Sequence, residues 1–219
     1  MAAACVRSGR APEAAALVAV SKTWPVERLR QFQAAGHDTF GENRVQEAAA
    51  KIPVVEPATW HLVGHLQKNK AAKAVELFDV IEAVDSVALA SRLDRLVGER
   101  GARGGGRLPI YFQVNVDEDP AKAGFMPAEL ERELGTLLTL PNIDVHGLMT
   151  VGFHTGGGEA ARPTFVRLRE LSERLRVTDP RLAPGLSMGM TDDYEVAIEE
   201  GSTLVRVGRA LFGERPRPA

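Results

Sequence analysis

The sequence predicts an α/β protein in which a single domain forms a (β/α)8, or TIM, barrel. Eight short apolar runs of strand length alternate with amphipathic runs of helical length along nearly the whole chain, which is the pattern of this barrel. The chain has 219 residues, somewhat fewer than the ~250 of a typical barrel of this kind, so we expect short loops. Periodicity also permits a doubly wound open sheet, but no G-x-G-x-x-G motif follows the first strand, which weighs against that alternative.

The first half of the chain is expected to form four strand–helix units. Its first strand is apolar on both faces, as parallel strands covered by helices are. The helix after it carries Val26, Leu29 and Phe32 at helical spacing and stops at Gly36, while Pro53 ends the second helix. The expected strands are residues 17–23, 37–43, 59–64 and 80–86, and the expected helices are residues 26–35, 45–52, 71–78 and 87–99.

The second half repeats the pattern. Its first strand alternates an apolar face with a polar face that carries Tyr111, Gln113 and Asn115, which indicates an enclosed interior with a polar function. The glycine triplet at residues 104–106 precedes this strand instead of opening a helix, so we interpret it as a connector and not as a phosphate loop. The expected strands are residues 110–116, 144–151, 185–190 and 203–208, the helices are residues 129–140, 163–177 and 193–200, and residues 209–213 form a short last element.

Composition limits the class of protein. The formal charge of −2 argues against a general nucleic-acid or membrane-surface binder, which would carry a basic excess. No apolar run approaches the ~18 residues of a membrane-spanning helix and the N-terminus lacks the apolar core of a signal peptide, so we expect a cytoplasmic protein. Cys5 is the only cysteine, which excludes an internal disulfide. The barrel is expected to span residues 17–213, after an extension at residues 1–16 that is frayed or forms a truncated helix.

Lys22 closes the first strand and is the first candidate for chemistry. It shares a strand face with Val18 and Val20, and in these barrels the functional site lies at the C-terminal ends of the strands. Because a buried ammonium is costly, a lysine placed there is either paired or poised as a neutral amine that attacks a carbonyl. The alternative is a lysine that reaches solvent from the strand end.

The ends of the last two strands indicate an anion site. Ser187 and Gly189 end the seventh strand, and Gly208, followed by Arg209, ends the eighth; residues this small let backbone N–H groups approach a ligand. Barrels of this kind often bind phosphate at this place. Glycines that merely form tight turns are the alternative.

Arg206 lies within the last strand and faces the same side as Leu204. A guanidinium inside a barrel needs a partner, either a ligand atom or a strand acid such as Glu42 or Glu82. Pyridoxal phosphate fits this set of side chains. It carries an aldehyde that could react with Lys22, a phosphate for the strand ends and a pyridine nitrogen for Arg206.

Two other chemistries are disfavoured. Glycosidases need two carboxyl groups at a defined separation, and no pair of acids stands at the strand ends. His61 and His65 are four residues apart, but they flank a break between strand and loop and do not share a helical face, so we expect no metal site.

Five motifs, in order, resemble those of the pyridoxal phosphate homeostasis protein family. They are residues 18–23 (VAVSKT), 40–47 (FGENRVQE), 60–70 (WHLVGHLQKNK), 187–193 (SMGMTDD) and 201–213, and the resemblance covers residues 17–213. It implies a single pyridoxal phosphate-binding barrel of the alanine-racemase N-terminal type. It also implies that the protein binds the cofactor and buffers or delivers it without substantial turnover.

The resemblance also implies roles for particular residues. Lys22 is expected to form the Schiff base and Arg206 to lie against the pyridine nitrogen, while Ser187, Gly208 and Arg209 serve the phosphate and Asn43 and Met149 line the ring; His61 and Gly189 complete the candidate set. An arginine at the pyridine nitrogen disfavours protonation of the ring, which weakens it as an electron sink and suits storage of the cofactor.

The chain departs from the family pattern in two ways. The helix that usually precedes the first strand is shortened or lost, and Arg209 stands where some relatives carry a small hydroxyl residue. Lys122, in the loop after the fifth strand, is a second basic candidate near the barrel mouth, with a solvated loop lysine as the alternative.

Two enzymatic functions compete with cofactor handling. An amino-acid racemase of the same barrel type needs a second acid–base group, and the chain offers only Tyr111 and Tyr194 as tyrosines. A lysine-dependent aldolase would use Lys22 on a sugar phosphate without any cofactor. We expect a monomer whose partners are pyridoxal phosphate and the apo forms of enzymes that use it.

Overall fold

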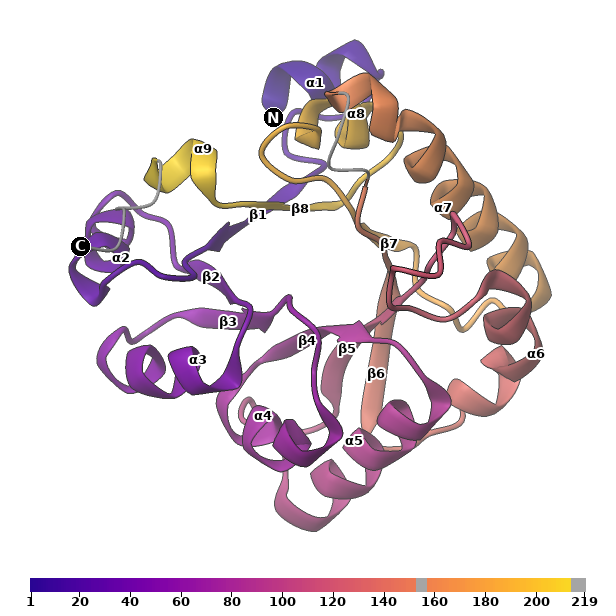
Figure 1. Cartoon of the computed structure of the whole chain (residues 1–219), viewed down its shortest axis with the longest axis horizontal. Helices are drawn as coiled ribbons and strands as arrows, with labels where there is room; N and C mark the ends of the chain where they lie inside the picture. Colours follow the sequence, from indigo (N-terminus) through magenta and orange to yellow (C-terminus); the bar gives the residue numbers. More distant parts are fainter. Residues whose placement is uncertain (153–156, 214–219) are drawn as a thin grey trace.

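Eight parallel strands form a closed barrel in the order β1 to β8. The computed structural model describes residues 1–152 and 157–213. Helices surround the barrel on its outer side (Figure 1), so the predicted (β/α)8 fold is confirmed. None of the helices in the described part of the chain is both long and apolar enough to cross a membrane.

The observed elements follow the expected order. The strands are β1 Ala16–Val20, β2 Thr39–Glu42, β3 Thr59–Leu62, β4 Val80–Val84, β5 Leu108–Gln113, β6 Ile143–Met149, β7 Gly185–Ser187 and β8 Leu204–Val207. The helices are α1 Ala2–Arg7, α2 Val26–Ala34, α3 Val45–Lys51, α4 Ala71–Leu77, α5 Val87–Arg100, α6 Pro127–Leu137, α7 Gly158–Thr178, α8 Tyr194–Glu199 and α9 Arg209–Phe212. Short 3-10 turns occupy Ile52–Val54 and Lys68–Lys70.

Two boundaries differ from expectation in ways that matter later. Helix α7 begins at Gly158 instead of Pro163, so this proline, taken as a helix start, lies inside the helix. Strand β1 ends at Val20, and Lys22 lies in the turn that follows it. The amide of Trp24 donates to the carbonyl of Ser21 over 3.0 Å and closes that turn.

The strands separate two apolar regions. Inside the barrel, Val18, Tyr111, Met149 and Leu204 belong to one buried cluster, while a larger cluster fills the space between strands and helices. Close packing inside explains the glycine at position 41, because a Cβ there would lie 2.7 Å from Cγ1 of Val18. Because the barrel interior is filled with apolar side chains and polar residues gather at the C-terminal ends of the strands, a functional site is expected at that end of the barrel.

The N-terminal residues form a short docked helix. Helix α1 packs beside α8 (Figure 1), with Ala4 and Cys5 fully buried in a small apolar cluster that Ile198 shares. The Ser8 hydroxyl donates to the carbonyls of Ala4 and Cys5 at the end of the helix.

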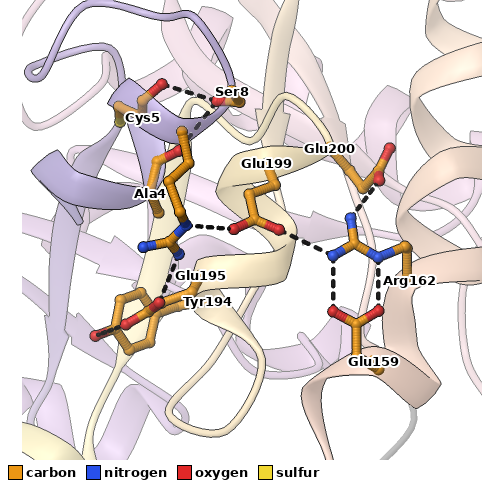
Figure 2. A network of polar contacts seen from close by, with 10 residues as sticks. Ala4, Cys5, Ser8, Glu159, Arg162, Tyr194, Glu195, Glu199 and Glu200 are labelled. Atoms are coloured by element: carbon orange, nitrogen blue, oxygen red, sulfur yellow. Dashed lines mark hydrogen bonds and ion pairs between the residues drawn. The ribbon is translucent and has the colours of Figure 1, made fainter.

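Charged side chains join α1, α8 and the start of α7 around that cluster. Arg7 bonds Glu195 over 2.7 Å and Glu199 over 2.9 Å. Glu199 also accepts from Arg162 of α7, over 2.9 Å, and Arg162 bonds Glu159 too (Figure 2). The network ties the N-terminal helix to the helix that follows β7.

Candidate functional site

A pocket of about 800 Å³ opens at the C-terminal ends of the strands. It draws residues from the ends of seven of the eight strands or from the loops that follow them. Its lining consists of Val20, Lys22, Trp24, Asn43, Val63, Gly64, His65, Gln113, Val151, Met190, Thr191, Asp192, Arg206, Gly208, Arg209 and Gly213. Among the predicted site residues, the pocket thus brings together Lys22, Asn43, Arg206, Gly208 and Arg209.

Lys22 lines this pocket from the turn after β1. Its side chain is half-buried, and Val20, two residues before it, lines the same pocket. The alternation predicted for the first strand therefore carries through the turn: Val18 fills the barrel interior, Val20 lies at the pocket and Lys22 reaches its mouth. A primary amine at this place can meet a carbonyl carbon held in the pocket.

Arg206 lines the pocket from β8 and is only 5% exposed. Its Nη2 donates to the carbonyl of Thr150 over 2.8 Å, and its Nη1 donates to the hydroxyl of Ser187 and lies 3.7 Å from Oε2 of Glu82. The sequence left open whether Arg206 pairs with a ligand atom or with a strand acid, either Glu42 or Glu82. The structure shows Glu82 as the acid, and the guanidinium also borders the pocket. Burial lowers the pKa of Arg206, an effect that the nearby Glu82 carboxylate opposes.

Glu82, which is itself fully buried, is the centre of a buried hydrogen-bond network beneath the pocket. Its Oε1 lies 2.6 Å from Nδ1 of His61, and its Oε2 accepts from the Ser187 hydroxyl over 2.5 Å. Burial alone would raise the pKa of Glu82, but the contacts with His61, Arg206 and Ser187 together lower it below its ordinary value. The network holds a carboxylate against the guanidinium and so fixes the charge of Arg206 at the pocket floor.

The predicted residues that do not line the pocket lie beneath or behind it. His61 and Ser187 are occupied by Glu82, and Met149 is fully buried in the barrel interior. Gly189 has φ +100°, and a Cβ on it would lie 2.6 Å from Cβ of Ala197, so it faces α8.

The segments after β7 and β8 lie where the sequence predicts an anion site. Met190, Thr191 and Asp192 line the pocket on one side, and Gly208 and Arg209 line it on the other. The amide of Ala210 donates to Oγ1 of Thr191 over 3.4 Å, and Arg209 bonds the Asp192 carboxylate, over 2.5 Å to Oδ1. These contacts join the two segments into one polar rim with backbone N–H groups, a hydroxyl and a guanidinium.

Close backbone packing sets the position of Asn43 at the pocket. Asn43 follows β2, and Gly64 follows β3 beside it. A Cβ on Gly64 would lie 2.5 Å from the carbonyl oxygen of Asn43, so only glycine lets the two strand ends approach this closely.

Sequence reasoning missed several lining residues, among them Trp24, His65, Gln113, Thr191 and Asp192. Each follows or ends a strand, so extending the strand-end search by a few residues into each loop would have found them. Trp24 is held by ring stacking on Phe212 of α9, with centroids 5.8 Å apart.

Lys122 lies close to the mouth and is tied to its surroundings. Its Nζ contacts Asp117 Oδ2 over 2.9 Å and donates to the carbonyl of Val151 over 3.2 Å. It lines a smaller cavity of about 180 Å³ that shares Gln113 and Val151 with the main pocket. Within residues 1–152 and 157–213, no group of three or more His, Cys, Asp or Glu side chains is arranged to hold a metal ion.

Comparisons with known proteins identify the family of the chain. The family model described as alanine racemase, N-terminal domain, matches residues 5–216. The pyridoxal phosphate homeostasis protein of Aquifex aeolicus is 39% identical over 97% of this chain and 92% of its own length. Its counterpart from Pseudomonas aeruginosa is 40% identical over 95% of this chain and 88% of its own length.

Solved structures point the same way. PipY of Synechococcus elongatus, solved without PLP, is 43% identical and superposes with a TM-score of 0.86, with 97% of this chain and 98% of PipY covered. Its structure with PLP bound has a TM-score of 0.84 at 42% identity and the same coverage. An alanine racemase from Clostridium difficile, at 15% identity and a TM-score of 0.74, shares the fold over 93% of this chain and 52% of the racemase. The chain therefore belongs to the alanine racemase N-terminal domain family and, within it, to the pyridoxal phosphate homeostasis proteins.

Proposed function

We propose that this protein binds pyridoxal 5'-phosphate covalently through Lys22 and buffers or delivers it without substantial turnover. The observation that carries the proposal is that Lys22, Arg206 and the polar rim after β7 and β8 all line the same pocket at the barrel mouth. The PLP-bound structure of PipY, 42% identical to this chain, supports the proposal.

The residues fit the three chemical groups of the cofactor. The Lys22 amine bonds to the aldehyde carbon to form a C=N bond, and the aldehyde oxygen leaves as water. The polar rim would hold the phosphate through the Thr191 hydroxyl, backbone N–H groups near Gly208 and the Arg209 guanidinium, which Asp192 contacts in the structure. Arg206, which borders the same pocket, would hold the pyridine nitrogen.

The remaining predicted residues have supporting roles in this proposal. Asn43 borders the ring as a lining residue. Ser187 and His61 act through the Glu82 network that holds Arg206, while Met149 and Gly189 shape the wall beneath the pocket.

The electrostatics favour storage of the cofactor over carbanion chemistry. The Arg206 guanidinium is positively charged and can only donate hydrogen bonds. It therefore favours a pyridine nitrogen that accepts a hydrogen bond and opposes protonation of that nitrogen. Racemisation also needs a second acid–base group. Neither tyrosine lines the pocket, and burial raises the pKa of Tyr111 to about 12, which keeps its phenol neutral at ordinary pH.

Cofactor transfer tests the function directly. The protein loaded with pyridoxal phosphate is expected to show a visible absorption band and to restore activity to an apo-enzyme that needs the cofactor. It is expected not to racemise L-alanine at an enzymatic rate of ~1 per second or faster. Loaded protein that restores no activity at any ratio would remove delivery from the proposal, and fast racemisation would replace it with an enzyme.

We also propose that the protein acts as a monomer. Among the described residues, the large apolar side chains that are exposed are Val6, Val54, Met126 and Val177, which lie on different elements or loops and form no stripe for a permanent partner. Light scattering on the same preparation is expected to return the mass of one chain, and a stable value of twice that mass would contradict the proposal.

A further inference from the structure

The turn that carries Lys22 is held from behind by one helix. Lys51 of α3 donates from Nζ to the carbonyl of Ser21 over 2.8 Å. Glu47, one turn earlier on α3, accepts from the amide of Thr23 over 3.1 Å. These groups belong to the two peptide units that adjoin the Cα of Lys22, so α3 restrains the backbone on both sides of this lysine.

Lys51 is itself fixed by a buried acid. Glu42, at the end of β2, is fully buried, and its Oε1 accepts from Lys51 over 2.6 Å and from the Ser21 hydroxyl over 2.7 Å. Lys51 is 8% exposed, so the ion pair lies almost wholly out of water. The pair therefore ties the end of β2, the C-terminal turn of α3 and the start of the Lys22 turn into one unit.

This arrangement is costly. Oε2 of Glu42 is buried with no hydrogen-bond partner, and burial raises the pKa of the Glu42 carboxyl despite the contact with Lys51. Thr23 adopts φ +67°, a left-handed conformation that is unfavourable for a β-branched residue. A buried ion pair of this kind often adds little net stability, so stability alone does not account for it.

We propose that Lys51, Glu42 and Glu47 are positioning residues that hold the Lys22 amine at the angle and depth needed for reaction with the cofactor aldehyde. This proposal rests on the proposed function of Lys22. None of the three side chains lines the pocket, so their effect on the cofactor passes through the backbone of residues 21–23. A displacement of about 1 Å at a reacting group can cost on the order of 100-fold in rate, so a restrained turn has a large effect on the reaction.

The test separates covalent from non-covalent binding. Pyridoxal 5'-phosphate reacts with Lys22, whereas pyridoxine 5'-phosphate has the same ring and phosphate with an alcohol in place of the aldehyde. Lys51→Met is expected to slow growth of the absorption band with pyridoxal phosphate by about tenfold or more. Its affinity for pyridoxine phosphate is expected to stay within about twofold of the wild-type value, because the pocket lining is unchanged.

Two further variants keep the test decisive. Glu47→Ala removes the restraint on Thr23 without touching the buried pair, and it should slow the same reaction even if Lys51→Met does not fold. Lys73→Met is the matched control, because Lys73 pairs with Glu76 over 3.1 Å on the exposed surface of α4 and should react like the wild type.

Each outcome has a distinct meaning. A wild-type protein that forms no covalent bond with pyridoxal phosphate would overturn the proposed function itself. If the wild type reacts, and a folded Lys51→Met or Glu47→Ala variant reacts at the wild-type rate, the positioning role of that residue is overturned. The proposed function itself then stands. A variant that loses affinity equally for pyridoxal phosphate and pyridoxine phosphate would also overturn the positioning role, because that result indicates general damage to the pocket.

Discussion

At the scale of single residues, the charge of the buried Arg206 at the pocket floor must be balanced by a nearby carboxylate. Arg206 has lost nearly all contact with water, and Glu82 lies 3.7 Å away to balance its charge. Removing one partner of such a pair leaves an uncompensated buried charge, which costs far more than the pair contributes. Glu82 is therefore expected to matter for folding and not only for cofactor binding.

Substitution of Glu82 tests this balance. Glu82→Gln keeps the shape of the side chain but removes its charge, and it is expected to lower the free energy of unfolding by about 3–5 kcal/mol. Chemical denaturation at pH 7 measures the change. Glu76→Gln, which alters an exposed acid of α4, serves as the control and should leave the denaturation midpoint nearly unchanged.

The same variant also tests how the contribution of Glu82 to stability depends on pH. The pKa of Glu82 is lowered in the folded protein, so the stabilisation by its carboxylate is present above the unfolded pKa of ~4.3 and is lost as the pH falls through the folded pKa. The difference in stability between wild type and Glu82→Gln should stay constant near neutrality and narrow below about pH 4. A difference that widened on acidification would contradict this account.

At the scale of elements, the docking of α1 on α8 combines surface ion pairs with a buried apolar contact. Its ion pairs lie at the surface, since the side chains of Arg7 and Glu195 are about half exposed, whereas Ala4 and Cys5 are fully buried. Figure 2 shows Glu195 and Glu199 of α8 in this network. Exposed pairs contribute little because water screens them, so the apolar contact should hold the helix in place. Helix α8 follows the pocket-lining segment 190–192, so α1 supports the rim indirectly.

Cys5 reports this docking because it is the only cysteine in the chain. A thiol reagent should label Cys5 slowly in the native protein, since the sulfur is buried. Ala4→Asp places a carboxylate in the apolar contact and should raise the labelling rate about tenfold or more, while Arg7→Ala should change it only about twofold. Fast labelling in Arg7→Ala would show instead that the ion pairs hold the helix.

At the scale of the whole molecule, the barrel could be predicted because each unit carries its own local pattern. Strand alternation put Val18 on the same face as Lys22 and Tyr111 on the face that indicated an enclosed interior, and both Val18 and Tyr111 lie in the cluster inside the barrel. The strand-end rule put Lys22 at the mouth of the barrel, where it lines the pocket. Closure of the sheet could not be read from these local patterns. It depends on the pairing of β1 with β8, which lie at opposite ends of the chain.

The contacts that could not be predicted at the site have the same physical origin. Ser187 is expected to serve the phosphate, and the structure adds that its hydroxyl donates to Glu82 of β4 across the barrel interior. Such a contact depends on the stagger of distant strands, which the sequence of either strand does not reveal. Thr191 and Asp192 were missed for a simpler reason, because the site extends past the strand ends into the loops.

The central claim is that one lysine, Lys22, holds the cofactor, and borohydride trapping tests it most directly. The protein is incubated with pyridoxal phosphate, reduced, digested and mapped by mass spectrometry. The account predicts loss of the visible band and a phosphopyridoxyl mass on the peptide that contains Lys22. The same mass on Lys122 instead, or no labelled peptide at all, would contradict it.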